Sequence, residues 1–151
     1  MKLAKRMKGF TLIELLIVIA LIAVLAGAIM IALNPARQFA QARNSERWSH
    51  LNAIMNLISQ NTVENRGVFT CASGGGIPTT TVSTISSAAY DICDCLVPTY
   101  TNALPYDPTY GHYTDCTDYD TNYTVTQSSS TSRITLDAPG AELSASITIT
   151  Q

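Results

Sequence analysis

Glu14 is a lone carboxylate inside an apolar stretch, and its charge needs a chemical explanation. Residues 10–33 read FTLIELLIVIALIAVLAGAIMIAL, and all 24 are apolar or small except Thr11 and Glu14. A charge inside a membrane span is costly unless it is paired or lies near an interface. The sequence therefore predicts a partner of opposite charge for Glu14.

A short basic leader ends at Gly9, directly before this stretch. An ordinary secretory signal is cleaved after an apolar run of roughly 7–15 residues. The run here is longer, and no such cleavage site followed by a polar start is evident near its end. We therefore expect cleavage at Gly9, which leaves the backbone accessible to a peptidase. The leader cations keep it on the cytoplasmic side; they are Lys2, Lys5, Arg6 and Lys8.

Cleavage after Gly9 would create an α-amino group on Phe10, the cation that Glu14 needs. Within one helix this pair competes with backbone geometry, so the amino terminus of a neighbouring identical subunit is the better partner. In a staggered helical assembly the pair would set the axial register, because a misplaced subunit leaves both charges unpaired. The alternative is a Glu near a helix N-terminus, stabilised by the helix dipole and solvated by headgroups.

Residues 8–16, KGFTLIELL, resemble the prepilin cleavage and methylation motif of type IV pilins and type II secretion pseudopilins. The resemblance implies cleavage between Gly9 and Phe10 by a membrane-embedded prepilin peptidase, followed by N-methylation of Phe10. It also implies polymerisation, with Phe10 and Glu14 as assembly residues. The implied partners are identical subunits in a helical filament, the peptidase, the pilus assembly platform with its motor ATPase, and the membrane. The implied location is the inner membrane before assembly and a cell-surface filament afterwards.

The chain divides into four predicted segments. These are the leader (1–9), a transmembrane and filament-core helix (10–33), an amphipathic continuation of that helix (34–66) and a globular head (67–151). At about 1.5 Å per residue, the 24-residue stretch spans a hydrocarbon core of about 30 Å. The predicted class is α+β with the pilin fold: one long helix, its first half transmembrane, packed against an antiparallel sheet of about three to four strands.

Residues 34–66 carry one apolar helical face. Asn34-Pro35 is compatible with a fresh helix that begins at Pro35 or with a kinked continuation of the first helix, and we favour one long helix that is bent or briefly loosened here. Arg66-Gly67 is a plausible helix end. The apolar face predicts core packing against a sheet, and it consists of Trp48, Leu51, Ile54, Met55 and Ile58. The polar residues of the same segment are expected to point away from this face; they are Arg43, Glu46, Arg47 and His50.

The head begins with a loop and ends in strands. Residues 70–87 are rich in Gly, Ser and Thr and read as a loop, and residues 86–96 are a candidate short helix. Residues 123–126, 133–136 and 146–150 alternate as strands do, and the first two form a hairpin. The Leu-Pro-x-Asp-Pro segment at 104–108, followed by these strands, is similar to small pilins and the major pseudopilin.

Four cysteines lie beyond the span. An even count in a small translocated domain favours disulfides, and three pairings are open. Since Cys93-x-Cys95 is too close for an easy bridge to itself, we expect Cys71–Cys93 and Cys95–Cys116. A zinc site is the alternative, but it lacks the paired C-x2-C spacing.

One acidic cluster has residues that could do chemistry, and it consists of Asp115, Asp118 and Asp120. Oxygen ligands at alternate positions suit Ca²⁺, and the major pseudopilin family carries a calcium site in a comparable loop. The loop that starts at Asp118 nevertheless has Tyr123 and Ser129 where an EF-hand has Gly and Glu. We favour a solvated acidic loop. No cofactor is expected, and no catalytic motif appears, so no enzymatic activity is predicted.

Charge and motif together favour an assembly protein. Without residues 1–9 the chain has five basic and eleven acidic side chains, and residues 67–151 hold eight acidic ones and only Arg133 as a cation. This excludes a broad basic surface for nucleic acid in the head. The expected function is a structural subunit of a type IV pilus, which in the family serves adhesion, twitching motility or DNA uptake. The alternatives are a type II secretion pseudopilin and a single-span anchored domain that never polymerises.

Overall fold

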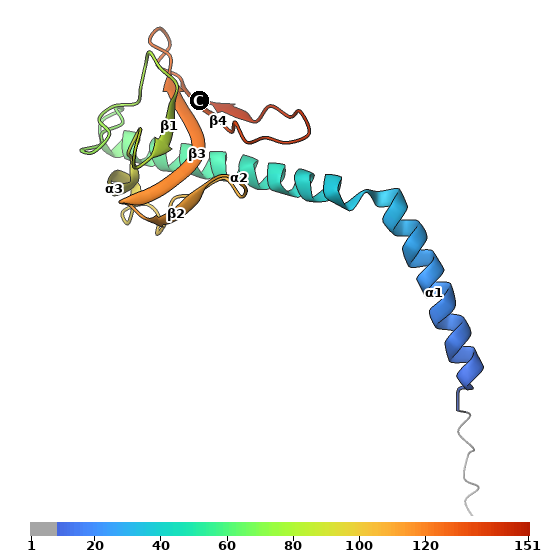
Figure 1. The fold of residues 1–151 in the computed structure, drawn as a ribbon. Helices are drawn as coiled ribbons and strands as arrows, with labels where there is room; N and C mark the ends of the chain where they lie inside the picture. The colour runs from blue at the N-terminus through green and yellow to red at the C-terminus, as the bar shows by residue number, and fades with distance from the viewer. Residues whose placement is uncertain (1–8) are drawn as a thin grey trace, which may run out of the picture. The chain divides into compact units, whose positions relative to one another are not determined.

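The computed structural model describes residues 9–151, except the side chains of Ile31 and Ala32, so the predicted leader apart from Gly9 lies outside the described residues. The chain forms two compact units; one ends at Gln38 and the other spans Phe39–Gln151. Figure 1 shows the order of the elements, with a helical N-terminal region and a small sheet later in the chain. This is the predicted α+β architecture, consistent with the pilin fold.

Helix α1 (Leu12–Leu33) has Thr11 as its N-cap and is exposed along its described length. Leu12–Met30 is long and apolar enough to cross a membrane, with a mean hydropathy of 3.0. Asn34 then adopts a left-handed conformation (φ 42°) and helix α2 begins at Pro35. The Asn34 side chain accepts a hydrogen bond from the Arg37 N–H at 3.4 Å, as an N-cap does. The helix is therefore interrupted at the single residue Asn34, which agrees with the favoured long helix that is briefly loosened here, and α2 restarts there with the geometry of an N-cap.

Helix α2 (Pro35–Glu64) packs its apolar face into the second unit. Leu51, Ile54, Met55 and Ile58 are all at most 3% exposed, which confirms the predicted packing of these four residues. Trp48 was wrongly included, since it is 43% exposed. Arg47 was predicted to point away from the core, which is wrong because its side chain is completely buried. Near residue 47, α2 packs against polar loops, and these loops hold the charge of Arg47.

The end of α2 follows the expected capping pattern. Arg66 and Gly67 both have positive φ angles, 62° and 91°, and the Gly67 N–H donates to the carbonyl of Thr62 at 2.8 Å. Glycine adopts this backbone conformation without a steric penalty. The predicted helix end at Arg66-Gly67 is therefore confirmed.

An antiparallel sheet of five strands packs on α2, one more strand than the predicted maximum. β1 (Ser83–Ser86), β3 (Asp118–Gln127), β4 (Ile134–Asp137) and β5 (Thr148–Thr150) lie in that order, and β2 (His112–Asp115) pairs with the start of β3. β3, β4 and β5 correspond to the three predicted strands. β1 and β2 were missed because both are short and polar, and β1 lies inside the Ser/Thr-rich run.

β3 carries the inward-facing side of the sheet. Its residues alternate, with Tyr119, Thr121, Tyr123 and Val125 at most 1% exposed. Period-two alternation buries one face of a strand. Of these, Tyr119, Tyr123 and Val125 join the α2 face in one core together with other buried residues, which include Ile85, Ile92, Leu96, Leu104, Leu136 and Ile147.

The disulfides are Cys71–Cys95 and Cys93–Cys116, so the predicted pairing is wrong. Cys93 and Cys95 lie on the one-turn helix α3 (Cys93–Leu96), where a step of two residues turns the side chain by about 200°. Cys93 is completely buried beside the β2–β3 turn that carries Cys116, whereas Cys95 is half-buried and reaches the loop of Cys71. The Cα–Cα distances of 5.4 and 5.3 Å suit both bridges.

We predict that non-reducing peptide mapping recovers the pairs Cys71–Cys95 and Cys93–Cys116. Only Asp94 separates the two cysteines of α3, so the digest must cut before Asp94, for example with an Asp-specific endoprotease. Recovery of a Cys71–Cys93 peptide, or of four free thiols, would contradict the pairing described here.

Candidate functional site

The expected cleavage bond lies in an exposed, non-helical segment. Gly9 and Phe10 precede the N-cap Thr11, and Phe10 is 90% exposed. A Cβ added to Gly9 would meet no atom within 4 Å. A peptidase can therefore reach the Gly9–Phe10 bond without unwinding α1. The structure does not test the predicted cleavage and methylation themselves.

Glu14 closes a capping box at the start of α1. Its Oε2 accepts hydrogen bonds from the Thr11 N–H at 2.8 Å and the Thr11 hydroxyl at 2.7 Å, and the Thr11 hydroxyl oxygen accepts from the Glu14 N–H at 3.2 Å. This is the local arrangement expected of a Glu near a helix N-terminus. Among the described residues, no hydrogen bond reaches Oε1. The carboxylate is thus fixed one turn from Phe10 with one oxygen free, and its pairing between subunits stays a prediction.

Helix α1 exposes an extended apolar surface along the part of it that the structure describes. The large apolar side chains of α1 that the structure describes are each at least half exposed, from Leu12 at 80% through Leu16 at 50% to Leu33 at 57%. A soluble monomer rarely exposes an apolar surface of this extent. Lipid or other copies of a similar helix are the environments that would cover it.

A buried ion network ties α2 to two loops of the second unit. Arg47 is completely buried and points its Nε and Nη2 at the Asp107 carboxylate, at 2.7 and 3.2 Å. Its Nη1 donates to Asn44 and Glu142, both at 2.9 Å, and Nη2 also donates to the Thr109 hydroxyl at 3.1 Å. All five N–H groups of the guanidinium therefore have an acceptor, which is what a buried arginine requires.

The acidic partners of the network are held equally firmly. Asp107 Oδ1 also accepts from the backbone N–H groups of Thr109 and Tyr110. Glu142 receives a two-pronged bond from Arg43, at 2.7 and 2.6 Å, and its backbone exchanges two hydrogen bonds with the Asn44 side chain. Every charged group of this cluster is thus hydrogen-bonded within the protein, which ties the loops of Asp107 and Glu142 to α2.

The network keeps its charges over most of the pH range. Burial would raise the pKa of the Asp107 carboxyl, but hydrogen bonds from Arg47, Thr109 and Tyr110 outweigh it and lower the pKa. Hydrogen bonds from Arg43 and Arg47 lower the pKa of Glu142 to about 2. Groups whose pKa is depressed by folding stabilise the folded state above their unfolded pKa. This contribution is present above about pH 4.5 and is lost as the pH falls toward 2.

Two glycines let the loops approach this network. A Cβ on Gly140 would lie 2.6 Å from Asp107 Oδ2, and a Cβ on Gly111 would lie 2.7 Å from the Asp107 backbone nitrogen. Real Cβ atoms do not tolerate such contacts, so both positions depend on glycine.

The network was not predicted from the sequence. Asp107 was noted only as part of the Leu-Pro-x-Asp-Pro segment, and Arg43 and Arg47 were predicted to point away from the apolar face of the helix. His50 was likewise predicted to point away from the core, but it is half-buried, and its Nδ1 lies 3.0 Å from the Tyr123 hydroxyl. The sequence offered one signal, an arginine at the edge of an apolar helical face. Local periodicity alone does not distinguish a buried arginine at such a position from a solvated arginine.

The structure does not gather the calcium candidates. Asp115 Oδ1 accepts from the N–H and hydroxyl of Thr117 within its own turn, Asp118 faces His112 at 3.3 Å, and Asp120 accepts from the N–H of Asn122. Within residues 9–151, no group of three or more His, Cys, Asp or Glu side chains is arranged to hold a metal ion. The four cysteines are in disulfides, which excludes the zinc alternative.

Comparison with known proteins identifies one segment. Residues 4–30 match the family model described as the prokaryotic N-terminal methylation motif, which is the signature of prepilins. The chain is therefore pilin-like or pseudopilin-like, and the motif implies prepilin peptidase processing and indicates a structural protein. No curated protein and no solved structure gives a significant match to the chain.

We predict that Arg47→Met destabilises the second unit by about 3–5 kcal/mol, because it leaves the buried Asp107 carboxylate without its counter-ion. Urea unfolding of the detergent-solubilised full chain, followed by the fluorescence of the single tryptophan, Trp48, measures this loss.

Arg43→Met is the matched control, since the Arg43 side chain is 37% exposed and its loss leaves Asp107 paired. The double variant Arg47→Met/Asp107→Leu should recover part of the stability. Equal unfolding midpoints for Arg47→Met and Arg43→Met would contradict the role of the buried pair.

Proposed function

We propose that this pilin-like chain is a structural subunit of a type IV pilus, which polymerises through its N-terminal helix. In this account the head displays an acidic, Ser/Thr-rich surface to solvent, and the filament serves adhesion, motility or DNA uptake. The protein is the substrate of a peptidase that also methylates Phe10, and it has no catalytic activity of its own.

The exposed apolar surface of α1, with its single carboxylate at the start, is the observation that supports this proposal most directly. Each fully buried Leu, Ile or Val side chain contributes about 1.5–3 kcal/mol relative to its exposed state. A bundle of such helices would bury many of these side chains at once. Before assembly the bilayer covers the same surface, so the subunit stays inserted in the inner membrane until it is transferred into the filament.

Glu14 gives this bundle a register. In apolar surroundings an unpaired carboxylate is costly, and the capping box satisfies only one of its oxygens. The α-amino group created on Phe10 by cleavage supplies a cation to a neighbouring subunit. An axial shift between two helices would separate these charges, so the pair selects one stagger.

A pseudopilin of a type II secretion system is the second candidate, because the same N-terminal segment serves both kinds of assembly. Two disulfides in the head and a Ser/Thr-rich exposed surface favour a pilus, whose heads face the extracellular medium. Electron microscopy of the native cells separates the two: long surface filaments support the pilus, and their absence supports the pseudopilin.

We predict that Glu14→Ala leaves the protein inserted and processed but abolishes or strongly shortens filaments, because the Phe10 amine of the neighbour loses its counter-charge. Filaments are scored by electron microscopy and by shearing from cells, and mass spectrometry of the N-terminus monitors processing.

Glu46→Ala is the matched control, since it removes an exposed carboxylate from α2 and should leave filaments unchanged. The processed mass should correspond to loss of residues 1–9 with one added methyl group in both variants. Normal filaments from Glu14→Ala would refute the register role, and an intact chain that retains Met1 in the wild type would refute the processing.

A further inference from the structure

One cleft of the second unit adjoins the buried ion network. It has a volume of about 360 Å³, and its walls come from α2 and from the loop that carries Asp107. Arg47 and Asp107, which form the buried ion pair, are sequence neighbours of three of the lining residues. The pair therefore anchors both walls of the cleft. The lining residues are Glu46, His50, Pro105, Tyr106 and Pro108.

The walls of this cleft are held in place by contacts that need no ligand. Nε of Arg47 lies 2.7 Å from Oδ2 of Asp107, and both side chains are completely buried. Asp107 Oδ1 also accepts hydrogen bonds from the backbone N–H groups of Thr109 and Tyr110, which fix the turn of the loop. The two prolines of the lining restrict the loop further, since the proline ring fixes φ. A preformed site loses little conformational entropy when a ligand binds.

The imidazole of His50 is oriented by a buried hydroxyl. Its Nδ1 lies 3.0 Å from the hydroxyl of Tyr123, a completely buried residue. Its Nε2 lies 3.8 Å from Oε1 of Glu46, which is beyond hydrogen-bond distance. Among the described residues, Glu46 forms no other ion pair. The carboxylate therefore keeps its hydrogen-bonding capacity for a ligand.

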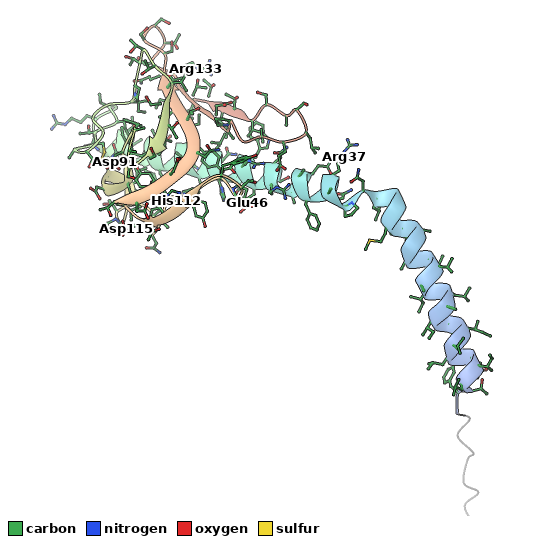
Figure 2. All side chains as sticks on the ribbon, viewed as in Figure 1. Arg37, Glu46, Asp91, His112, Asp115 and Arg133 are labelled. Atoms are coloured by element: carbon green, nitrogen blue, oxygen red, sulfur yellow. A yellow bond between two sulfur atoms is a disulfide. The ribbon has the colours of Figure 1, made fainter. Side chains whose placement is uncertain are left out.

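Glu46 carries the unmatched charge of this region. The adjoining network is neutral, because two arginines face two carboxylates in it; they are Arg43, Arg47, Asp107 and Glu142. An ordinary imidazole is uncharged above its usual pKa of about 6.5. Glu46, which is exposed on α2 and labelled in Figure 2, therefore gives the cleft a negative charge. A ligand of complementary chemistry is a cation.

The remaining wall of the cleft is aromatic and apolar. Tyr106 is 41% exposed and lies between Pro105 and Pro108 in the lining. The face of a tyrosine ring attracts ammonium and guanidinium groups. Proline rings add apolar surface, which suits the CH₂ groups of a short aliphatic stem. These walls favour an organic cation over a hydrated metal ion.

We propose that this cleft binds an organic cation, an ammonium or guanidinium group carried on a short aliphatic stem. The Glu46 carboxylate receives the charged head, the Tyr106 ring packs against it, and the two prolines contact the stem. The volume of about 360 Å³ lies within the range of small-ligand sites, about 300–1,000 Å³. A free amine or guanidine has this chemistry, and so does the lysine or arginine side chain of a protein.

The site is independent of the proposed function. All its residues belong to the second unit, and binding is measured on the detergent-solubilised full chain without filaments. The cleft takes no part in filament growth in this account, so Glu46→Ala still serves as the control for assembly. Failure of either proposal would leave the other unaffected.

Histidine NMR of the full chain tests the site with an internal control. The chain has two histidines, and the second, His112 on β2 (Figure 2), faces Asp118 at 3.3 Å. His112 is also an imidazole beside a carboxylate, but it does not line the cleft. Titration with n-butylguanidinium at about pH 8, where an ordinary imidazole is neutral, should shift the ring signals of His50 saturably and leave those of His112 unchanged. The variant His112→Gln assigns the two sets of signals.

Variants and a neutral probe identify the groups that bind the cation. Glu46→Gln should weaken n-butylguanidinium binding about tenfold or more, because a charge-assisted hydrogen bond is lost. Tyr106→Leu should weaken it about threefold or more through loss of the cation–π contact. Asp118→Asn removes an exposed carboxylate outside the cleft and should bind like the wild type. n-Butylurea, which has a similar shape without the charge, should not bind.

Glycyl-arginyl-glycine with blocked termini distinguishes the two sources of the cation. Binding as tight as that of n-butylguanidinium supports a protein side chain as the ligand, and weaker binding supports a free amine or guanidine. Equal shifts of both histidines, no saturable shift of His50, or unchanged binding by Glu46→Gln would overturn the site.

Discussion

The exposed apolar surface of α1 is the constraint on which the rest of the protein depends. A 22-residue helix of this composition is stable only in lipid or against other apolar helices. In the proposed filament Glu14 makes that environment specific, because a charge in an apolar bundle restricts the positions that a neighbour can take. The basic leader, the accessible Gly9–Phe10 bond and the capping box all lie within a few residues of this carboxylate. In the proposed function, membrane insertion and later polymerisation both follow from this surface.

The second unit shows a different solution to the same problem of buried charge. Arg47 is completely enclosed, and every N–H group of its guanidinium is matched by an acceptor from α2 or from two distant loops. The network therefore fixes the loops around Asp107 and Glu142 to the helix, while the disulfides fix α3 to its neighbours. A small sheet of short strands gains rigidity from these links, and a rigid head can present charges at defined places on its surface.

The sequence predicted the parts of the fold that depend on local pattern. The apolar span, the α2 face at Leu51 to Ile58, the capping by Gly67 and three strands each follow from composition or period. The predictions that were wrong have a common cause, because each depends on contacts between residues that are far apart in the sequence. Arg47 needs Asp107 and Glu142 to be buried, the direction of Cys93 depends on where α3 docks, and β1 and β2 become strands only by pairing with β3. The prediction of Phe10 and Glu14 as assembly residues rests on a signal contained in nine consecutive residues.

The most direct test of the account is a zero-length cross-link between Glu14 and the amino group of Phe10 in native filaments. After removal of residues 1–9 the chain contains no lysine, so the α-amino group of Phe10 is its only primary or methylated amine. Filaments grown from a mixture of ¹⁴N- and ¹⁵N-labelled subunits are treated with a carbodiimide and digested. We predict Phe10–Glu14 cross-linked peptides that contain one light and one heavy partner. Cross-links confined to peptides of a single isotope, or an unlinked protein that remains monomeric in the membrane, would contradict pairing between subunits.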